Sequence, residues 1–144
     1  MRSGFERVID LFKLDNHTIS INMDHDSFKA WLDLYGKAWT GRNPELIRDL
    51  FAKDAKYFEK PFSAPFDGID SIIQYWHGVT QTQKNVSFQY NILTVDQDLG
   101  IAHFLASFLR YSSIQVKLDG IFLVKLDSQN KCIKFEEWWQ SQKN

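Results

Sequence analysis

Two histidines are the side chains in this sequence best suited to acid–base chemistry near neutral pH. His77 follows Trp76 in an apolar helical pattern, and His103 lies beside Phe104 in a long strand pattern. Imidazole exchanges protons near neutrality, so either residue is a candidate general acid or base. A histidine within an apolar strand is also a common hydrogen-bonded core residue, and both interpretations of His103 stay open.

Motifs for several other chemistries are absent from the sequence. It has no glycine-rich phosphate loop, no serine-nucleophile motif and no cysteine–histidine pair. His77 and His103 each lack a second histidine or acid at metal-ligand spacing, so we expect no metal and no cofactor. The single cysteine, Cys132, lies in a strand pattern without an adjacent base, and we expect a half-buried structural thiol.

The composition narrows the classes of protein to which this chain can belong. Hydrophobic residues make up 44% and charged residues 24%, as in ordinary globular domains. The net charge is −1 and the basic residues are scattered, which argues against nucleic-acid binding. No apolar run approaches the ~18 residues of a membrane span, and no uninterrupted signal-peptide core is present. We therefore expect a cytoplasmic protein that binds neither nucleic acid nor membrane.

Hydrophobic patterns in the first half of the chain predict helices. Residues 1–22 read as an N-terminal extension, helical or flexible, and residues 23–144 as a single domain. Asp24 or Asp26 can cap a first long helix that ends at Gly41, and Asn43-Pro44 restarts a second. A third helix has apolar residues at helical spacing, at Ile69, Ile72, Ile73 and Trp76.

The second half of the chain changes to the alternating pattern of strands. After a short strand at 55–59, alternation begins near Asn85 and continues in segments 101–110, 114–126 and 132–140. Short turns between long strands predict an antiparallel meander. We therefore expect an α+β fold in which three N-terminal helices pack on a curved antiparallel sheet.

The strand at 114–126 is apolar on both faces. Phe122 and Val124 alternate with Ile121 and Leu123. Helices can cover one face of the sheet, but none remain for the other. We therefore predict a homodimer formed through the outer sheet face.

Three stretches together resemble one superfamily. The first is Leu34–Asp54, which closes with LFAKD and is followed by Ala55. The second is Tyr57–Trp76, with spaced proline and glycine residues and a final Tyr-Trp pair. The third is LDGIF at 118–122, followed by EWW at 137–139. Their order and spacing resemble the nuclear transport factor 2-like (SnoaL-like) superfamily, from Asp26 to the end of the sequence. The resemblance implies a cone-shaped α+β barrel with a pocket between sheet and helices. This fold hosts isomerases, cyclases, dehydratases, hydrolases and non-enzymatic binders, so it does not fix function.

The similarity to the ketosteroid isomerases of this fold implies three roles at the site. Tyr35 falls where the family has a tyrosine in its first helix, and Asp119 falls near a strand aspartic acid; both would hydrogen-bond a developing oxyanion. Asp119 shares a strand face with apolar residues, a setting that favours its neutral acid form. The base position falls on Glu59 or Lys60, because this sequence is one residue longer before Pro61.

Alternation along the short strand would send only one of those two side chains inward. It pairs Tyr57 with Glu59 on one face and Phe58 with Lys60 on the other. Glu59 pointing inward would supply a general base, whereas Lys60 pointing inward would remove the isomerase analogy. Structural roles compete: a core-edge aromatic for Tyr35, a bulge or turn residue for Asp119 and a solvated strand-end charge for Glu59.

Aromatic residues are expected to form the pocket walls around a small apolar molecule. The wall residues we predict are Trp39, Tyr57, Phe58, Phe62, Trp76, Phe104 and Trp139. Three hypotheses for function follow. The chain is a cofactor-independent proton-transfer enzyme, a binding module without turnover, or a dimeric interaction module whose cone is filled by side chains.

Overall fold

The computed structural model describes residues 23–144. The elements are α2 (His25–Thr40), α3 (Glu45–Arg48), β1 (Phe51–Phe58), β2 (Phe66–Asp67), α4 (Ile69–Thr82), β3 (Gln83–Asp96), β4 (Leu99–Arg110), β5 (Ile114–Leu126) and β6 (Cys132–Lys143). Within that range no helix has the length and apolarity needed to cross a membrane. The extension at 1–22 lies outside the described residues, so the domain boundary stays a prediction.

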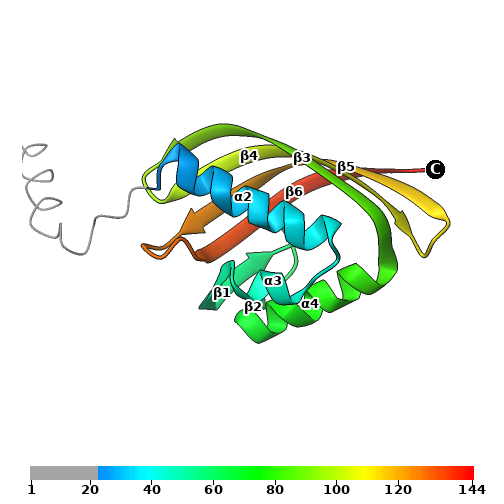
Figure 1. The fold of residues 1–144 in the computed structure, drawn as a ribbon, viewed down its shortest axis with the longest axis horizontal. Helices are drawn as coiled ribbons and strands as arrows, with labels where there is room; N and C mark the ends of the chain where they lie inside the picture. The colour runs from blue at the N-terminus through cyan, green and yellow to red at the C-terminus, as the bar shows by residue number, and fades with distance from the viewer. Residues whose placement is uncertain (1–22) are drawn as a thin grey trace, which may run out of the picture.

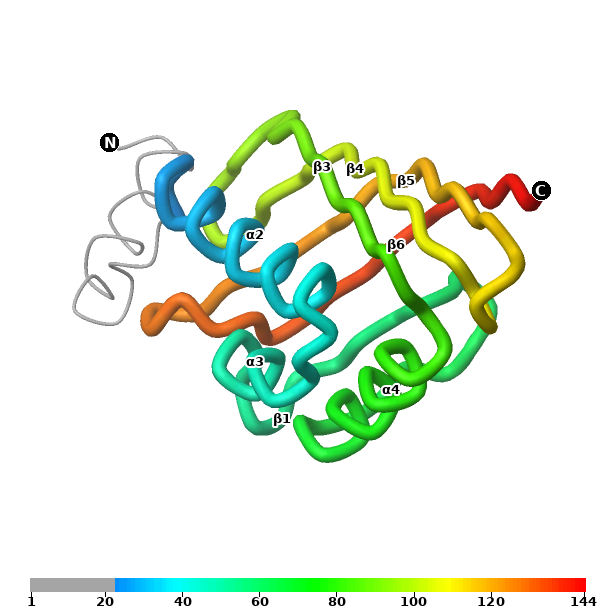
Figure 2. Tube along the Cα trace, turned by 45° about the vertical axis from the view of Figure 1, so that its right-hand side comes forward, coloured from blue at the N-terminus to red at the C-terminus, as the bar shows by residue number. Residues whose placement is uncertain are grey.

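The strands form one curved, open sheet in the order β2-β1-β6-β5-β4-β3. The antiparallel meander from β3 to β6 is confirmed. The sheet as a whole is mixed, because β1 pairs in parallel with β6 and antiparallel with β2. The long strands arch around α2, and α3 and α4 lie on the same concave side (Figures 1 and 2). The expected α+β cone is therefore confirmed.

Local signals in the sequence account for helix α2. The side chain of Asp24 accepts a hydrogen bond from the backbone N–H of Ser27 at 2.7 Å, which caps the first turn. At the other end the N–H of Gly41 reaches the carbonyl of Lys37. The apolar stripe of the helix faces the sheet and is buried at Phe28, Trp31, Leu32, Tyr35, Ala38 and Trp39.

The second helix is shorter than expected from the sequence. Helix α3 stops at Arg48, and Phe51 already begins β1. Phe51 pairs with Cys132 of β6, and the Cys132 N–H donates to the Leu50 carbonyl at 2.8 Å. Sheet pairing therefore takes over from the helical pattern, while Leu50 and Phe51 are buried as expected.

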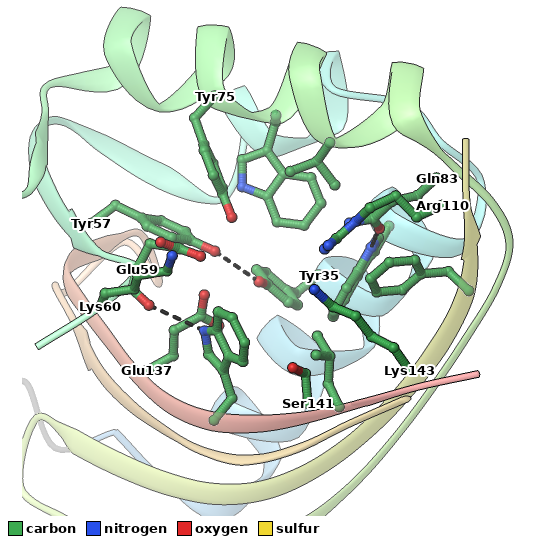
Figure 3. A pocket seen from close by; sticks show the side chains of 16 residues that line it. Tyr35, Tyr57, Glu59, Lys60, Tyr75, Gln83, Arg110, Glu137, Ser141 and Lys143 are labelled. Atoms are coloured by element: carbon green, nitrogen blue, oxygen red, sulfur yellow. Dashed lines mark hydrogen bonds between the residues drawn. The ribbon is translucent and has the colours of Figure 1, made fainter. Parts of the chain in front are cut away.

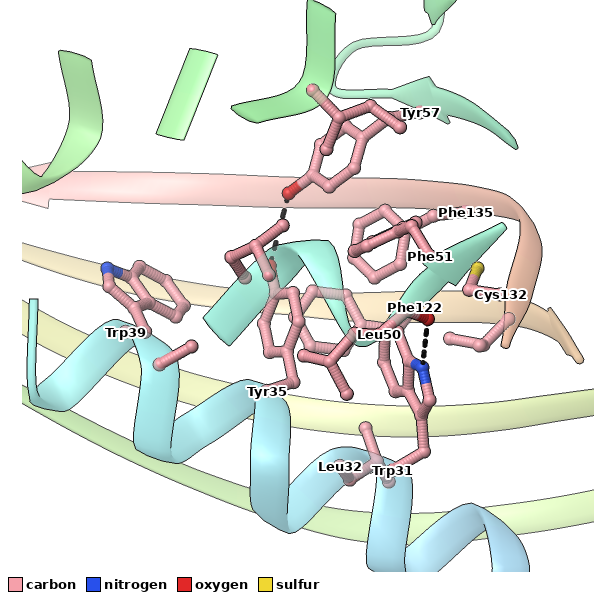
Figure 4. Packing of buried hydrophobic residues seen from close by; sticks show 14 of the residues in the cluster. Trp31, Leu32, Tyr35, Trp39, Leu50, Phe51, Tyr57, Phe122, Cys132 and Phe135 are labelled. Atoms are coloured by element: carbon pink, nitrogen blue, oxygen red, sulfur yellow. Dashed lines mark hydrogen bonds between the residues drawn. The ribbon is translucent and has the colours of Figure 1, made fainter. Parts of the chain in front are cut away.

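Aromatic side chains pack between α2 and the sheet (Figure 4). Phe122 stacks on Phe104 with ring centroids 4.0 Å apart, and Tyr57 stacks on Phe135 at 4.4 Å. The indole N–H of Trp31 donates to the Leu50 carbonyl at 2.9 Å. This rigid packing holds the inner ends of the cavity-lining side chains in place.

Strand β5 has one face toward this core and one face away from it. Phe122 and Val124 are fully buried, whereas Ile121 and Leu123 on the opposite face are partly exposed. On β5, Gly120 permits a close approach to β6: a Cβ there would lie 2.3 Å from the Trp138 carbonyl oxygen.

Candidate functional site

A cavity of about 230 Å³ lies between the concave face of the sheet and helices α2 and α4 (Figure 3). The residues that line it are Tyr35, Trp39, Tyr57, Glu59, Lys60, Tyr75, Trp76, Val79, Gln83, Phe108, Arg110, Leu118, Glu137, Trp139, Ser141 and Lys143. A second hollow of about 320 Å³ shares Glu59, Lys60, Glu137 and Trp139 with it. The cavity thus has aromatic walls, but it also carries both acidic and basic side chains.

Glu137 is the most unusual residue in the cavity. It lies on β6 between Phe135 and Trp139 on the inward face, and it is 8% exposed. Within the described chain its carboxyl group has no hydrogen-bond or ion-pair partner. Burial raises the pKa of Glu137 well above its ordinary value, and the nearby charge of Glu59 raises it further. The raised pKa favours the protonated, neutral form of the carboxyl group, which is the form that can donate a proton.

Glu59 and Lys60 both line the cavity, so the prediction that strand alternation sends only one of them inward was wrong. Strand β1 ends at Phe58, so alternation no longer governs the next two side chains. Partial burial raises the pKa of the Glu59 carboxyl, while Lys60 and Arg110 act against that rise. The Lys60 ammonium lies 5.7 Å from the centroid of the Trp139 ring.

A hydrogen bond from a tryptophan side chain to the Glu59 backbone connects this loop to the sheet. The indole Nε1 of Trp139 donates a hydrogen bond to the Glu59 carbonyl at 3.2 Å. Glu59 thus lines the same cavity as Glu137 although it belongs to a loop rather than to β6 (Figure 3).

Three tyrosine hydroxyls lie within the cavity. The hydroxyl oxygens of Tyr35 and Tyr57 are 3.1 Å apart and share a hydrogen bond, and Tyr75 lines the cavity from α4. Burial raises the pKa of all three phenols well above the ordinary value. They therefore remain neutral hydrogen-bond donors. Tyr35 therefore lines the cavity, and its role as an oxyanion donor stays a prediction.

Several predicted wall residues line the cavity. These residues are Trp39, Tyr57, Trp76 and Trp139. The Nε1 group of Trp76 is buried and has no hydrogen-bond partner within residues 23–144. An unpartnered donor of this kind is suited to a ligand acceptor.

Three other predicted wall residues do not line the cavity. Phe104 is fully buried in the stacked core, and Phe58 lies beneath the Lys134 ammonium, 5.6 Å from the ring centroid. The Phe62 side chain is fully exposed and borders the second hollow.

The placement of Asp119 and His103 in the pocket was wrong. Inward-facing Phe122 fixes the alternation of β5, so Asp119 points to the outer face of the sheet, where its side chain is 66% exposed. His103 lies on the same outer face, because its neighbour Phe104 points inward. The two side chains contact each other there, with His103 Nε2 2.6 Å from Asp119 Oδ1.

His77 also lies outside the cavity. It follows the buried Trp76 on α4, and a rotation of about 100° per helical residue turns it toward solvent. Its side chain is 52% exposed, and its Nε2 lies 3.8 Å from a carboxylate oxygen of Glu45. Neither predicted histidine therefore reaches the aromatic cavity.

Glu137, Tyr75 and Arg110 line the cavity but were not predicted from the sequence as cavity residues. A signal was available for Glu137, since strand alternation places it on the same face as Phe135 and Trp139. Cys132 is buried, and burial raises the pKa of its thiol, consistent with a structural role. Within residues 23–144, no cluster of His, Cys, Asp and Glu is arranged to hold a metal ion.

The raised pKa of the Glu137 carboxyl should make the stability of the protein depend on pH. Its pKa is raised on folding, so its stabilising contribution is complete below about 4.5 and is lost as pH rises toward the folded-state pKa. Across that window the free energy of unfolding should fall by about 1.4 kcal/mol per pH unit relative to Glu137→Gln. Urea unfolding at several pH values measures this difference.

Glu136→Gln is the matched control for that experiment. Glu136 is the adjacent carboxylate on the opposite face of β6, where it pairs with Lys134 at 2.8 Å. We expect no comparable divergence from wild type as pH rises. If the free energy of unfolding changed with pH in the same way for wild type and Glu137→Gln, the Glu137 carboxyl would have an ordinary pKa.

Comparisons with known proteins place this geometry in context. A family model described as SnoaL-like domain matches residues 29–132. A search of curated proteins found no match. Among solved structures, the chain is similar to SalBIII, an epoxide hydrolase/cyclase-like enzyme with a role in pyran ring formation in the polyether salinomycin. That match has 14% identity and a TM-score of 0.71, and covers 81% of this chain and 93% of SalBIII.

Two further solved structures show the same likeness. A candidate scytalone dehydratase from Novosphingobium aromaticivorans is 16% identical with a TM-score of 0.69, covering 81% of this chain and 85% of that chain. A protein with a ketosteroid isomerase-like fold from Catenulispora acidiphila, in complex with trimethylamine, is 16% identical with a TM-score of 0.67. That match covers 75% of this chain and 83% of the Catenulispora chain. At these identities the likeness establishes the fold.

Proposed function

The chain belongs to the family of SnoaL-like domains, and on this basis we propose that it is a small enzyme that transfers protons on a ring-sized substrate without a cofactor. The observation that carries the proposal is the buried, unpaired Glu137 carboxyl in a cavity that Glu59 also lines. Two acids whose surroundings differ are suited to opposite roles in acid–base catalysis. The reaction class is isomerisation, dehydration or cyclisation.

The geometry suggests a role for each group. Glu59 is the more exposed acid and acts as the base that removes a proton from carbon next to a carbonyl. Neutral Glu137 donates its proton to the oxygen on which negative charge develops, or to a departing hydroxyl group. The hydroxyl groups of Tyr35, Tyr57 and Tyr75 stabilise that oxygen by hydrogen bonding. Glu137 thereby takes the neutral-acid role that the family resemblance had assigned to Asp119.

Two solved structures support this class of chemistry. SalBIII is described as a cyclase-like enzyme in ring formation, and the Novosphingobium protein is described as a candidate dehydratase. Dehydration and ring closure, as general reaction classes, both use an acid and a base to transfer protons. In this chain the cavity residues named above provide an acid and a base for such a step.

The two competing hypotheses, a binding module and an interaction module, each predict a different kind of cavity. A binding module without turnover should have all polar groups of its cavity paired. Within the described residues, however, the buried Trp76 indole N–H has no partner, and no hydrogen bond contributes to the pKa of the Glu137 carboxyl. An interaction module with a filled cone should have no room for a ligand, whereas the cavity measures about 230 Å³. Both observations favour the enzyme.

Hydrogen–deuterium exchange on model compounds tests the proposed function. A panel of small cyclic ketones and β-hydroxy ketones, each with and without a carboxylate substituent, is incubated with the protein in D₂O. ¹H NMR follows exchange next to the carbonyl and loss of water. We expect the wild-type protein to accelerate at least one compound and Glu59→Gln to abolish the acceleration. If no compound reacts faster than with Glu59→Gln, the proposed function is wrong.

We also propose that two copies associate through the outer sheet face. Trp138 and Leu105 are exposed there, at 42% and 44%, and Ile121 lies opposite Trp138 in the β5–β6 register. Trp138→Lys should convert a dimer to a monomer in size-exclusion chromatography with light scattering. Leu34→Lys, at an exposed apolar residue on α2, is the matched control and should remain dimeric. A monomeric wild-type protein at micromolar concentration would contradict the proposal.

A further inference from the structure

The side of the cavity opposite the two acids is basic. Arg110 lies at the end of β4 and Lys143 at the end of β6. Figure 3 shows both side chains extending into the cavity from the side opposite Glu59 and Glu137. One end of the cavity therefore holds the two acids together with Lys60, and the other end holds two cations.

Strand pairing brings the basic residues together. Arg110 pairs with Gln83 across β3 and β4, while Phe108 and Lys143 both pair with Val116 of β5. The Arg110 guanidinium lies 5.5 Å from the centroid of the Phe108 ring, which supports its planar group. The sheet thus places Arg110 beside Gln83, while Lys143 approaches the same end of the cavity from β6, across β5.

These cations have no acidic partner in the described part of the chain. The ion pairs found within residues 23–144 include neither Arg110 nor Lys143. The Arg110 charge reaches into the cavity, since it opposes the rise in the pKa of Glu59. An anionic ligand would supply the missing partner.

Gln83 adds an oriented, buried hydrogen-bond donor. Its side chain is 8% exposed, and its Oε1 accepts a hydrogen bond from Trp39 Nε1 at 2.7 Å. Because an indole N–H can only donate, this contact fixes which end of the amide is the oxygen. The NH₂ group of Gln83 is therefore directed away from Trp39, and within residues 23–144 it has no partner.

We propose that the substrate carries a carboxylate group, which Arg110, Lys143 and the Gln83 amide bind at the end of the cavity opposite Glu137. This inference rests on the proposed function, because it names the class of substrate for the same site. The guanidinium fork matches the two oxygens of a carboxylate. A cavity of about 230 Å³ exceeds the ~150 Å³ that accommodates benzene, so a substituted single ring fits. The expected ligand is therefore a small cyclic acid rather than a purely apolar molecule.

Benzoate and benzamide test the inference directly, because they share a shape and differ in charge. We expect NMR titration to show that wild-type protein binds benzoate at least about tenfold more tightly than benzamide. Arg110→Gln and Lys143→Gln should each remove most of this preference. Lys117→Gln, on the outer face of β5, should retain it. Increasing salt should weaken benzoate binding and leave benzamide unaffected.

The outcomes separate this inference from the proposed function. Benzoate binding no tighter than benzamide, no saturable binding of benzoate, or an unchanged preference in Arg110→Gln would each overturn the carboxylate site. Glu137→Gln lies at the other end of the cavity and should keep the preference. A preference for benzoate without any deuterium exchange would contradict the proposed function alone, whereas exchange without the preference would contradict only the carboxylate site.

Discussion

Glu137→Gln will slow proton transfer by roughly 10²- to 10⁴-fold on any compound that the wild-type protein turns over. The amide keeps the shape of the carboxyl group but cannot release a proton, so the general acid is lost. The measurement is the initial rate of deuterium exchange or water loss, taken at several pH values. The wild-type rate should fall as pH rises through the pKa of Glu137, because only the neutral acid is active.

The control for this prediction uses the neighbouring carboxylate. Glu136→Gln removes a charge from the opposite face of β6, next to Lys134, and should leave the rate within about twofold. Comparable rates in Glu137→Gln and wild type would show that Glu137 has no part in the chemistry. Circular dichroism of both variants establishes that the comparison is between folded proteins.

Phe122→Ala will reduce the free energy of unfolding by about 3–5 kcal/mol. Phe122 is fully buried, and its ring stacks on Phe104 at 4.0 Å and contacts Tyr35 and Phe135 with centroid distances of 5.3 Å and 4.9 Å. Removing the ring leaves a space that rigid aromatic neighbours cannot fill. Urea unfolding at a pH below 7 measures the loss.

Leu93→Ala is the control for that prediction. Leu93 also loses a large apolar side chain, but it is 53% exposed on β3 and should lose well under 1 kcal/mol. A similar small loss for Phe122→Ala would mean that the aromatic cluster does not support the cone. Because Phe122 packs against Tyr35, the same variant should also weaken ligand binding.

Local patterns in the sequence were sufficient to predict α2 and the meander. Capping at Asp24, the apolar stripe and the alternation in β3–β6 all depend on residues close together in the chain. The parallel pairing of β1 with β6 depends on contacts such as Phe51 with Cys132, which are far apart in sequence. No local pattern encodes that pairing, so the length of α3 and the start of β1 could not be predicted.

The site was predictable only in part, and β5 shows why. Both faces of that strand are apolar, so alternation groups Asp119 with Ile121 but does not say which face the helices cover. On β6 the faces differ more clearly, because Glu137 shares the inward face with the buried Phe135. A carboxyl group on the buried face of an otherwise aromatic strand was the stronger signal.

Titration of the Glu137 carboxyl by ¹³C NMR, with the resonance assigned from the Glu137→Gln variant, is the most direct test of the neutral acid in the cavity. We expect a midpoint well above the ordinary value of 4.5, and a shift that disappears when the protein is unfolded. A midpoint at or below 4.5 would show that Glu137 is charged at neutral pH. It could not then donate the proton that the proposed reaction requires.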